Sequence, residues 1–348
     1  MKVHVTHILN TVYMNDYISL NHGSGASLTG KLIREIFAKR FGMTEPLTDS
    51  ATLHDPGCIL AFTTDSYVVD PIFFPGGDIG KLAMCGTLND LAVSGAIPRY
   101  ISASFIIEEG FPVEDLITIT DSMAAEAEKA GVKIVTGDTK VVEKGKCDKL
   151  FITTSGTGIL SPAYEHIGKA SKVKPGDKLI INGPVGNHSI AVLGARHSLD
   201  FNTPVISDCA SLSNLIRSIL NECKGVNFMR DVTRGGLAVV LNELAQMTRT
   251  GIAVNEDSIP VEEPVRGLCE ILGFDPLYLA NEGKVLIVAT EAEHRKVLDV
   301  MLTDPLGKNS EVIGEVVNNK GNAVILNTSI GGRRLLDMPS GMQLPRIC

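Results

Sequence analysis

The chain has 348 residues, of which 44% are hydrophobic and 21% charged, and its formal net charge is −8. This length exceeds what one hydrophobic core usually supports, so two domains are expected. The negative charge argues against nucleic-acid and anionic-membrane surfaces, and no segment approaches the roughly 20 apolar residues of a transmembrane helix. The seven scattered cysteines contain no CxxC pair, which argues against a zinc site or a disulfide framework and favours the cytoplasm.

The N-terminal region, 1–42, is predicted to be a flexible glycine-rich flap followed by a helix over 28–41. Gly25 to Lys31 matches the G-x-x-x-x-G-K part of a phosphate-binding P-loop, but Leu32 replaces the serine or threonine that would bind magnesium. A flap whose backbone amides fold over phosphates is the favoured interpretation.

The first α/β unit is predicted over 43–160, and residues 155–176 are expected to connect it to the second domain. Short apolar runs predict its strands, and proline and glycine mark the limits of its helices. Strands are expected at 58–62, 99–107, 132–135 and 150–154, and helices at 78–93 and 112–131.

The second unit is predicted over 161–337. Its helices are expected near 208–222, 235–248, 261–272 and 291–302, and its strands near 177–183, 226–229, 284–290, 311–317 and 322–326. Strands and helices alternate in both units, which indicates α/β layering. The last segment, 338–348, contains two prolines and a glycine and is predicted to be an extended, mobile tail.

Aspartates follow three of the predicted strands, at Asp65, Asp138 and Asp231. Open α/β sheets collect ligand-binding groups at strand ends. Asp90 is predicted on a buried helix, where a carboxylate needs a cation or donors, and Gly86 is expected to leave open space over it. Oxygen ligands without a Cys/His cluster suit Mg²⁺ bound together with phosphate. A cap or turn is the simpler interpretation of any single aspartate, so this hypothesis depends on all four.

Arginines and glycines lead into the predicted helix near 235. Such a helix start is suited to phosphate, and Arg234 would add positive charge beside Gly235 and Gly236. An ordinary glycine-rich turn is the alternative. Glu282 precedes a strand, and its own sequence context indicates a surface turn. Cys348 ends the chain, either as an incidental cysteine on a frayed tail or as a tethered substrate thiol that reaches its own pocket and a partner's.

Several motifs, in order, resemble one family, the carbamoyl dehydratases (HypE) of NiFe-hydrogenase maturation. They include Asn89–Arg99, Gly137–Lys140, Arg230–Gly236, Asn281–Lys284 and Pro345–Cys348. The resemblance covers nearly the whole chain. The terminal Pro-Arg-Ile-Cys separates this family from the related aminoimidazole ribonucleotide synthetases and selenophosphate synthetases.

The resemblance implies a two-domain α/β (α+β) fold like that of aminoimidazole ribonucleotide synthetase (PurM), with a flexible C-terminal tail. It implies a homodimer whose first-domain strands pair into a barrel. It also implies ATP-dependent dehydration of an S-carboxamide on Cys348 to an S-cyanate, the source of the cyanide ligand of the hydrogenase iron. The implied partners are a HypF-like carbamoyltransferase and a HypC–HypD-like iron-carrying complex.

The residue roles follow from the matching motifs. Mg²⁺ is expected on Asp65, Asp90 and Asp231, and Lys140 and Glu282 are expected to assist proton removal from the carbamoyl nitrogen, without a choice between them. The expected ATP contacts are Asp65, Asp90, Asp138, Thr139, Arg234, Gly235 and Gly236. Asp55 matches a metal position only in the selenophosphate synthetases, and Ala26, Asn187 and Ser189 depart from the family pattern. The alternatives are a related ATP-dependent enzyme acting on a free small molecule, and a non-enzymatic docking module.

Overall fold

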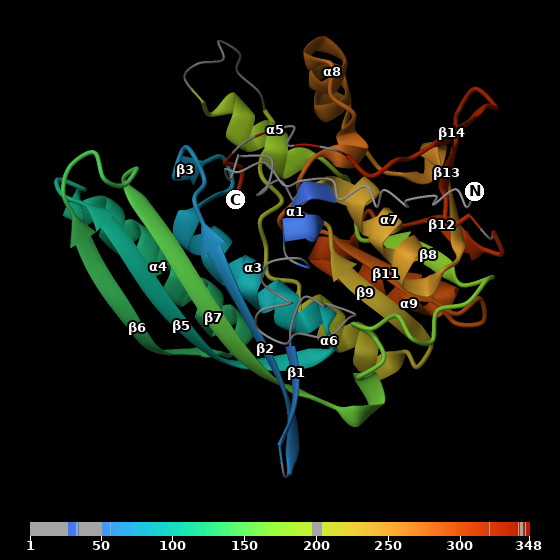
Figure 1. Cartoon of the computed structure of the whole chain (residues 1–348), viewed down its shortest axis with the longest axis horizontal. Helices are drawn as coiled ribbons and strands as arrows, with labels where there is room; N and C mark the ends of the chain where they lie inside the picture. The colour runs from blue at the N-terminus through green and yellow to red at the C-terminus, as the bar shows by residue number, and fades with distance from the viewer. Residues whose placement is uncertain are drawn as a thin grey trace, which may run out of the picture.

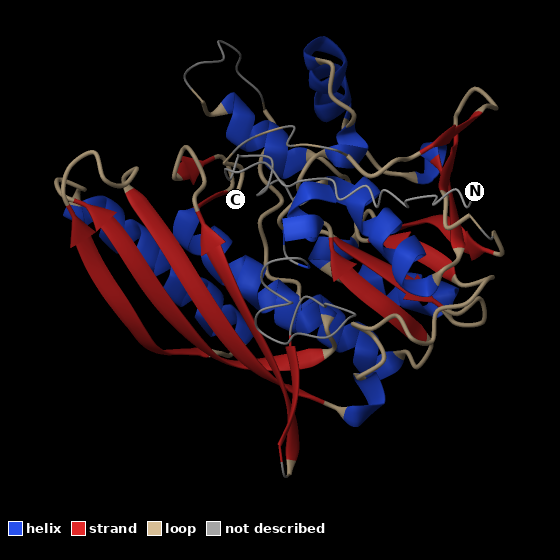
Figure 2. Ribbon diagram, in the orientation of Figure 1, coloured by secondary structure: helices blue, strands red, loops and turns tan. Residues whose placement is uncertain are grey.

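The computed structural model describes residues 27–32, 34, 51–55, 57–196, 204–319, 321–339, 341, 344 and 346–348. These residues form two units, each a sheet with helices packed on it, and the C-terminus lies between them (Figures 1 and 2). The predicted flap and most of the helix expected over 28–41 lie outside the described residues, apart from α1 (Ser27–Leu32). No helix in the described ranges is long and apolar enough to cross a membrane.

The first domain is a five-stranded sheet in the order β1-β2-β7-β5-β6. Its strands are β1 (Ala51–Asp55), β2 (Cys58–Tyr67), β5 (Ala96–Glu108), β6 (Lys133–Val142) and β7 (Leu150–Leu160). Only the β5–β6 pair is parallel; the other pairs are antiparallel. Two helices, α3 (Ile79–Val93) and α4 (Val113–Ala130), pack behind the sheet, and a short hairpin, β3 (Phe73–Phe74) and β4 (Gly77–Asp78), precedes α3 (Figure 1).

Helix α3 is the central buried element of this domain. Thirteen of its fifteen residues are buried, because its sequence is apolar on nearly every side. Asp78 caps it by accepting hydrogen bonds from the amides of Gly80 (2.7 Å) and Lys81 (3.1 Å). The prediction of a buried helix over 78–93 is therefore confirmed. The next helix, α4, ends at Gly131, whose φ of 69° is left-handed, as its glycine predicted.

The second domain is a seven-stranded sheet in the order β14-β13-β10-β12-β8-β11-β9. Its strands are β8 (Lys178–Ile181), β9 (Val226–Asp231), β10 (Gly251–Asn255), β11 (Val285–Ala289), β12 (Glu311–Val317), β13 (Val324–Asn327) and β14 (Arg333–Leu335). Its helices are α5 (Asn187–Gly194), α6 (Ser213–Glu222), α7 (Gly236–Thr248), α8 (Glu263–Leu272) and α9 (His294–Thr303). Helix α7 packs on one face of the sheet, and α6 and α9 pack on the other, so the predicted layering is confirmed.

The segment 204–212, called here the bridging segment, joins the two domains. The amide of Ser207 donates to the Pro75 carbonyl (2.8 Å) in the β3–β4 hairpin. The Asn89 side chain of α3 donates to the Ala210 carbonyl (3.1 Å) and accepts from the Leu212 amide (2.7 Å). Backbone groups of the second domain are thus satisfied by the first, which fixes the two domains relative to each other.

Three strand predictions stop at least five residues too early. Strand β7 continues from 154 to Leu160, so the connection expected over 155–176 begins only after that residue. Strand β2 continues through Asp65 to Tyr67, and β6 continues through Asp138 to Val142. These aspartates therefore lie within strands, and only Asp231 ends its strand as predicted. Burial along β2 alternates with a period of two, so the strand continues where its apolar run ends. Helix α6 begins at Ser213 rather than near 208, because the bridging segment has no helical structure.

Candidate functional site

A polar cavity of about 260 Å³ lies between the two domains. It combines acidic side chains of both domains with one arginine and the C-terminal cysteine. Its lining residues are Thr63, Thr64, Asp65, Ser66, Tyr67, Gly86, Asp90, Asp231, Thr233, Arg234, Glu282 and Cys348. Six of the predicted site residues therefore meet in one place, although they come from segments far apart in the sequence.

The first-domain wall is built by β2 and α3. Alternate residues of β2 face α3, so the Thr63 hydroxyl donates to Asp90 (2.7 Å) and the Tyr67 hydroxyl donates to Asp65 (3.1 Å). Burial, followed by the charges of Asp65 and Asp90, raises the pKa of Tyr67 well above its usual value, so this hydroxyl stays protonated and donates.

The expectation that Gly86 leaves open space over Asp90 is wrong. A Cβ placed on Gly86 would lie 2.2 Å from the Tyr67 hydroxyl oxygen. The glycine instead admits the tyrosine, which lies against α3 and reaches Asp65.

The second-domain wall comes from the end of β9 and the turn that follows it. All six residues of β9 are buried, and the strand delivers Asp231 to the cavity. Gly235 and Gly236 adopt left-handed φ values of 82° and 65° at the start of α7, where the helix was predicted to begin. Neither glycine lines the cavity, whereas Arg234 does. Cys348, followed by the carboxylates of Asp65 and Glu282, raises the pKa of Arg234, whose side chain is exposed, so the guanidinium remains charged.

Glu282 is buried rather than part of a surface turn, with only 3% of its surface exposed. The bridging segment holds it, because Asp208 accepts from the amides of Glu282 (3.3 Å) and Gly283 (3.1 Å) and forms an ion pair with Lys284 (3.2 Å). Burial, followed by the nearby Cys209 and aspartates, raises the pKa of Glu282 well above its usual value, and Arg234 opposes this shift. Within the described residues, Glu282 Oε1 has no hydrogen-bond partner.

The C-terminal residues are docked rather than frayed. The Arg346 carbonyl accepts from the Asp70 amide (3.1 Å) and from Arg196 (2.8 Å), and the Arg346 guanidinium forms an ion pair with Asp148. Ile347 is 4% exposed and packs in the first-domain core.

This arrangement places Cys348 inside the cavity. The residue is half-buried, and desolvation of its thiol raises the pKa to about 12, against the opposing charge of Arg234. The docked thiol is therefore protonated and a poor nucleophile.

The predicted residues on β6 lie outside this cavity. Across the sheet, Asp65 pairs with Thr154, Thr154 with Ala103, and Ala103 with Gly137. Three interstrand spacings separate the first position from the last, or about 14 Å. Asp138, Thr139 and Lys140 follow Gly137 on the exposed edge strand, and Asp138 and Thr139 line a different pocket. The structure therefore does not bring these three residues to Asp65 within one chain. Asp55 ends β1, and its side chain lies outside the described part of the structure.

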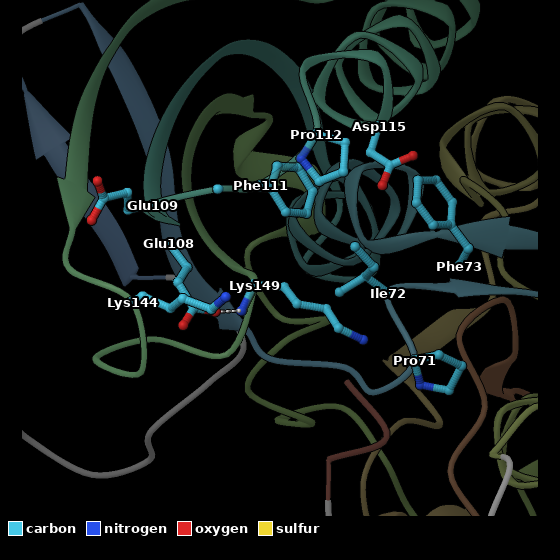
Figure 3. Close-up of a pocket in the computed structure, with 11 residues that line it drawn as sticks. Pro71, Ile72, Phe73, Glu108, Glu109, Phe111, Pro112, Asp115, Lys144 and Lys149 are labelled. Carbon is cyan, nitrogen blue, oxygen red and sulfur yellow. Dashed lines mark hydrogen bonds between the residues drawn. The ribbon is translucent and has the colours of Figure 1, made fainter.

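A second pocket, of about 400 Å³, lies beside the β3 hairpin (Figure 3). Its floor includes the loop before β7, which the Glu108 carboxylate fixes by accepting from the amides of Gly145 and Lys149. It contains Glu108, Glu109, Asp115, Lys144 and Lys149, but none of the predicted site residues. The cavity around Cys348 is therefore the candidate site.

Some residues of the site were not predicted. Thr63 and Tyr67 share the inner face of β2 with Asp65, and the period of two was the available signal. His188 is fully buried and contacts the tail, and in the sequence this stretch was marked only by the nearby Gly186 and by the departures of Asn187 and Ser189 from the family pattern. Asp208 has no local signal, because its role depends on backbone amides more than 70 residues away.

The chain matches the family model of AIR synthase related proteins over both domains, the N-terminal model at residues 48–160 and the C-terminal model at 174–327. It is 48% identical to the carbamoyl dehydratase HypE of Rhodobacter capsulatus, with 96% of this chain and 99% of that protein covered.

Two solved structures are similar along nearly their whole length. A HypE–HypF complex gives a TM-score of 0.83 at 47% identity, covering 88% of this chain and 99% of that one. A HypE in complex with ATP gives 0.80 at 43% identity, covering 95% and 100%. With both domain models matched and near-complete relatives at this level of identity, the chain belongs to the HypE family of AIR synthase related proteins.

Proposed function

We propose that this protein is an ATP-dependent carbamoyl dehydratase of hydrogenase maturation, whose substrate is an S-carboxamide carried on its own Cys348. The observation that carries the proposal is the position of the C-terminal thiol, inside a cavity with Asp65, Asp90, Asp231 and Glu282. The relatives named carbamoyl dehydratase HypE, and the HypE that was solved with ATP, support it.

The reaction requires removal of the amide oxygen, which is a poor leaving group. Transfer of the γ-phosphoryl group of ATP to this oxygen converts it into a phosphate ester. The C–O bond then breaks, phosphate leaves with the bonding electrons, and loss of the N–H protons completes the C≡N bond. The products are an S-cyanate, ADP and phosphate. Arg234 offsets charge on the transferred group, which is where catalysis of phosphoryl transfer mainly acts.

The nucleotide is expected to bind with Mg²⁺. Among the described residues, no three His, Cys, Asp or Glu side chains gather closely enough to enclose a metal ion. Mg²⁺ usually takes one or two carboxylates together with phosphate oxygens and water, so this donor set fits an ion shared with ATP. Asp65, Asp90 and Asp231 are the residues expected to hold Mg²⁺, one or two of them on a given ion, and the ion would supply positive charge beside the phosphates.

Glu282 is the base that the geometry of one chain supports. Its Oε1, which has no partner among the described residues, can accept a proton from the carbamoyl nitrogen. A carboxyl group with a pKa above its usual range suits proton transfer near neutral pH.

Lys140 reaches a site only if a second copy supplies it. The sheet face opposite α3 exposes large apolar side chains, including Phe62, Tyr100 and Ile159, which supports a homodimer paired across this face. Mixing a Lys140→Ala variant with a Cys348→Ala variant tests this arrangement. Only a lysine that acts across the dimer restores dehydration in the mixture, whereas a lysine that acts within its own chain leaves the mixture inactive.

The proposed partners are a HypF-like carbamoyltransferase, which loads the thiol, and a HypC–HypD-like complex, which receives the cyanide. The solved HypE–HypF complex supports the first of these. Since the docked Cys348 lies half-buried in the cavity, loading by a second protein requires that the tail leave the cavity. A cytoplasmic location is part of the proposal, and the seven free cysteines fit a reducing compartment.

Mass spectrometry of the C-terminal peptide tests the function. Cleavage after lysine releases a peptide that begins after Lys320 and has Cys348 as its only cysteine. With a carbamoyltransferase and carbamoyl donor we expect a carboxamide adduct on this peptide, and with ATP the adduct should lose one water. Cys348→Ala should show neither form. An unmodified peptide from a protein that consumes ATP on a diffusible compound would refute the proposal.

A further inference from the structure

The tail is held next to its final residue by a buried histidine. His188, near the start of α5, is fully buried, and its Nε2 lies 2.8 Å from the Ile347 carbonyl oxygen. Its Nδ1 lies 2.7 Å from the Ser207 hydroxyl, and Phe74 packs edge-on against the ring at 5.4 Å. These contacts involve both domains and the tail, so the ring lies at their junction.

The partners of the ring fix its tautomer. A carbonyl oxygen only accepts, so Nε2 carries the hydrogen and donates to Ile347. In the neutral ring Nδ1 then accepts from the Ser207 hydroxyl. The Ser207 oxygen in turn accepts from the Cys209 amide (3.1 Å), so the hydroxyl is both oriented and occupied. The direction of each of these three hydrogen bonds is thus determined, which favours a single orientation of the imidazole ring and of the Ser207 hydroxyl.

The same chain of bonds reaches the catalytic cavity. Ser207 and Cys209 flank Asp208, which accepts from the amides of Glu282 and Gly283. The bridging segment therefore contacts the base on one side and, through His188, the tail on the other. Because the Ile347 carbonyl belongs to the peptide group that joins Cys348, its hydrogen bond also restricts where the thiol points.

We propose that His188 is a positioning residue, which holds the Ile347 carbonyl through Nε2–H and so places the group on Cys348 against Glu282 and Arg234. This inference rests on the proposed function, since it assigns His188 to the docked, reacting state of the tail. His188 does not touch the reacting atoms. It acts through the tail backbone and through the bridging segment.

The rate at which Cys348 is alkylated measures docking of the tail, and it does so independently of the dehydration reaction. The docked thiol is half-buried and protonated, and a protonated thiol reacts poorly, so iodoacetamide modifies mainly the undocked tail and the rate follows the undocked population. Cys58 is exposed and provides an internal reference. The peptide after Lys320 reports Cys348 alone.

Two substitutions separate the ring nitrogens. In His188→Asn the side-chain amide replaces Nδ1 and does not reach Ile347, whereas in His188→Gln the longer amide places an N–H donor near the position of Nε2. Loss of the buried hydrogen bond should raise the alkylation rate of Cys348 about tenfold in the asparagine variant, and the glutamine variant should stay within about threefold of the unaltered protein. Dehydration of a preloaded S-carboxamide should fall in the asparagine variant and be retained in the glutamine variant.

Equal alkylation rates in the unaltered protein and the asparagine variant, or equal acceleration by both substitutions, would overturn the proposal. If thermal unfolding and Cys58 alkylation show that the asparagine variant is not folded, Ser207→Ala decides, because it frees the ring while leaving it in place. This variant should raise Cys348 alkylation several-fold, and no rise would refute the role of His188. If the unaltered protein never forms an S-cyanate, the proposed function fails while the alkylation result still stands.

Discussion

Replacing Gly86 with alanine tests how the wall of the cavity is packed. An added Cβ would lie 2.2 Å from the Tyr67 hydroxyl oxygen but 3.1 and 3.2 Å from ring atoms Cζ and Cε1, so the severe overlap is with the hydroxyl alone. The tyrosine is restrained, because its ring is buried and its hydroxyl donates to Asp65. The alanine must therefore displace the hydroxyl from the site.

Two opposing effects set how much Gly86→Ala changes the free energy of unfolding. Overpacking a buried site costs about 1–3 kcal/mol, and exchanging glycine for alanine in a helix interior returns up to about 1 kcal/mol. We expect Gly86→Ala to lower the free energy of unfolding by about 1–2 kcal/mol. In a Tyr67→Phe background the hydroxyl is gone, so the same substitution should cost close to nothing, a coupling of about 1–2 kcal/mol.

Urea denaturation of the four proteins in this double-mutant cycle measures the coupling. Gly267 in α8 is a matched control, because an added Cβ there meets nothing within 4 Å. Gly267→Ala should stabilise the protein by up to about 1 kcal/mol. If Gly86→Ala has the same cost in the unaltered background and in the Tyr67→Phe background, the packing argument is refuted.

Three further predictions concern the docked tail and the base. Glu282→Gln keeps the size and shape of the side chain but removes the base, so single-turnover dehydration should fall about 100-fold while loading of Cys348 persists; equal rates would remove Glu282 from catalysis. Asp148→Asn weakens a half-exposed ion pair with Arg346, so Cys348 alkylation should rise only about two- to fivefold, and a larger rise would mean that this pair dominates docking. The docked pKa of Cys348, about 12, lies above the ordinary value of 9.0, so docking is fully favoured below pH 9 and weakens as the pH rises toward 12. Proteolysis of the tail should therefore accelerate over that range, and a flat profile would contradict the desolvation of the docked thiol.

Local sequence signals predicted α3, α4 and α6 to α9 and the apolar parts of most strands, but no helix was predicted at α5 and no strand at β10. The apolar run of α3, with a capping aspartate before it, placed this helix to within a residue, and the glycine at 131 placed the end of α4. The predicted strand ended at residue 62, because the prediction followed the run of apolar residues and not the alternation of inward-facing and outward-facing side chains. Thr63, Asp65 and Tyr67 form the inner face of that strand, and their polarity reflects the cavity they line rather than a strand end.

The position of Glu282 could not be predicted from its neighbours. Its burial depends on Asp208, which lies 74 residues earlier and accepts from its backbone amide. Likewise, the tail was predicted to be mobile from its prolines and glycine, but its docked position depends on His188, Arg196 and Asp148. Composition describes the conformational freedom of a segment and does not identify its binding site.

The bridging segment explains why the acidic side chains of the two domains and the C-terminal tail lie at fixed positions relative to one another. A Cβ on Gly283 would lie 2.0 Å from the Asp208 carbonyl oxygen, so this backbone approach requires glycine. The buried Asp208–Lys284 ion pair would leave an uncompensated charge if either partner were lost, which penalises any other placement of the loop. Since the same segment also bonds to Pro75 and Asn89 of the first domain, it sets the distance between Glu282 and the aspartates of β2 and α3. The acid–base geometry at Cys348 is therefore a property of the domain junction, and neither domain alone contains the site.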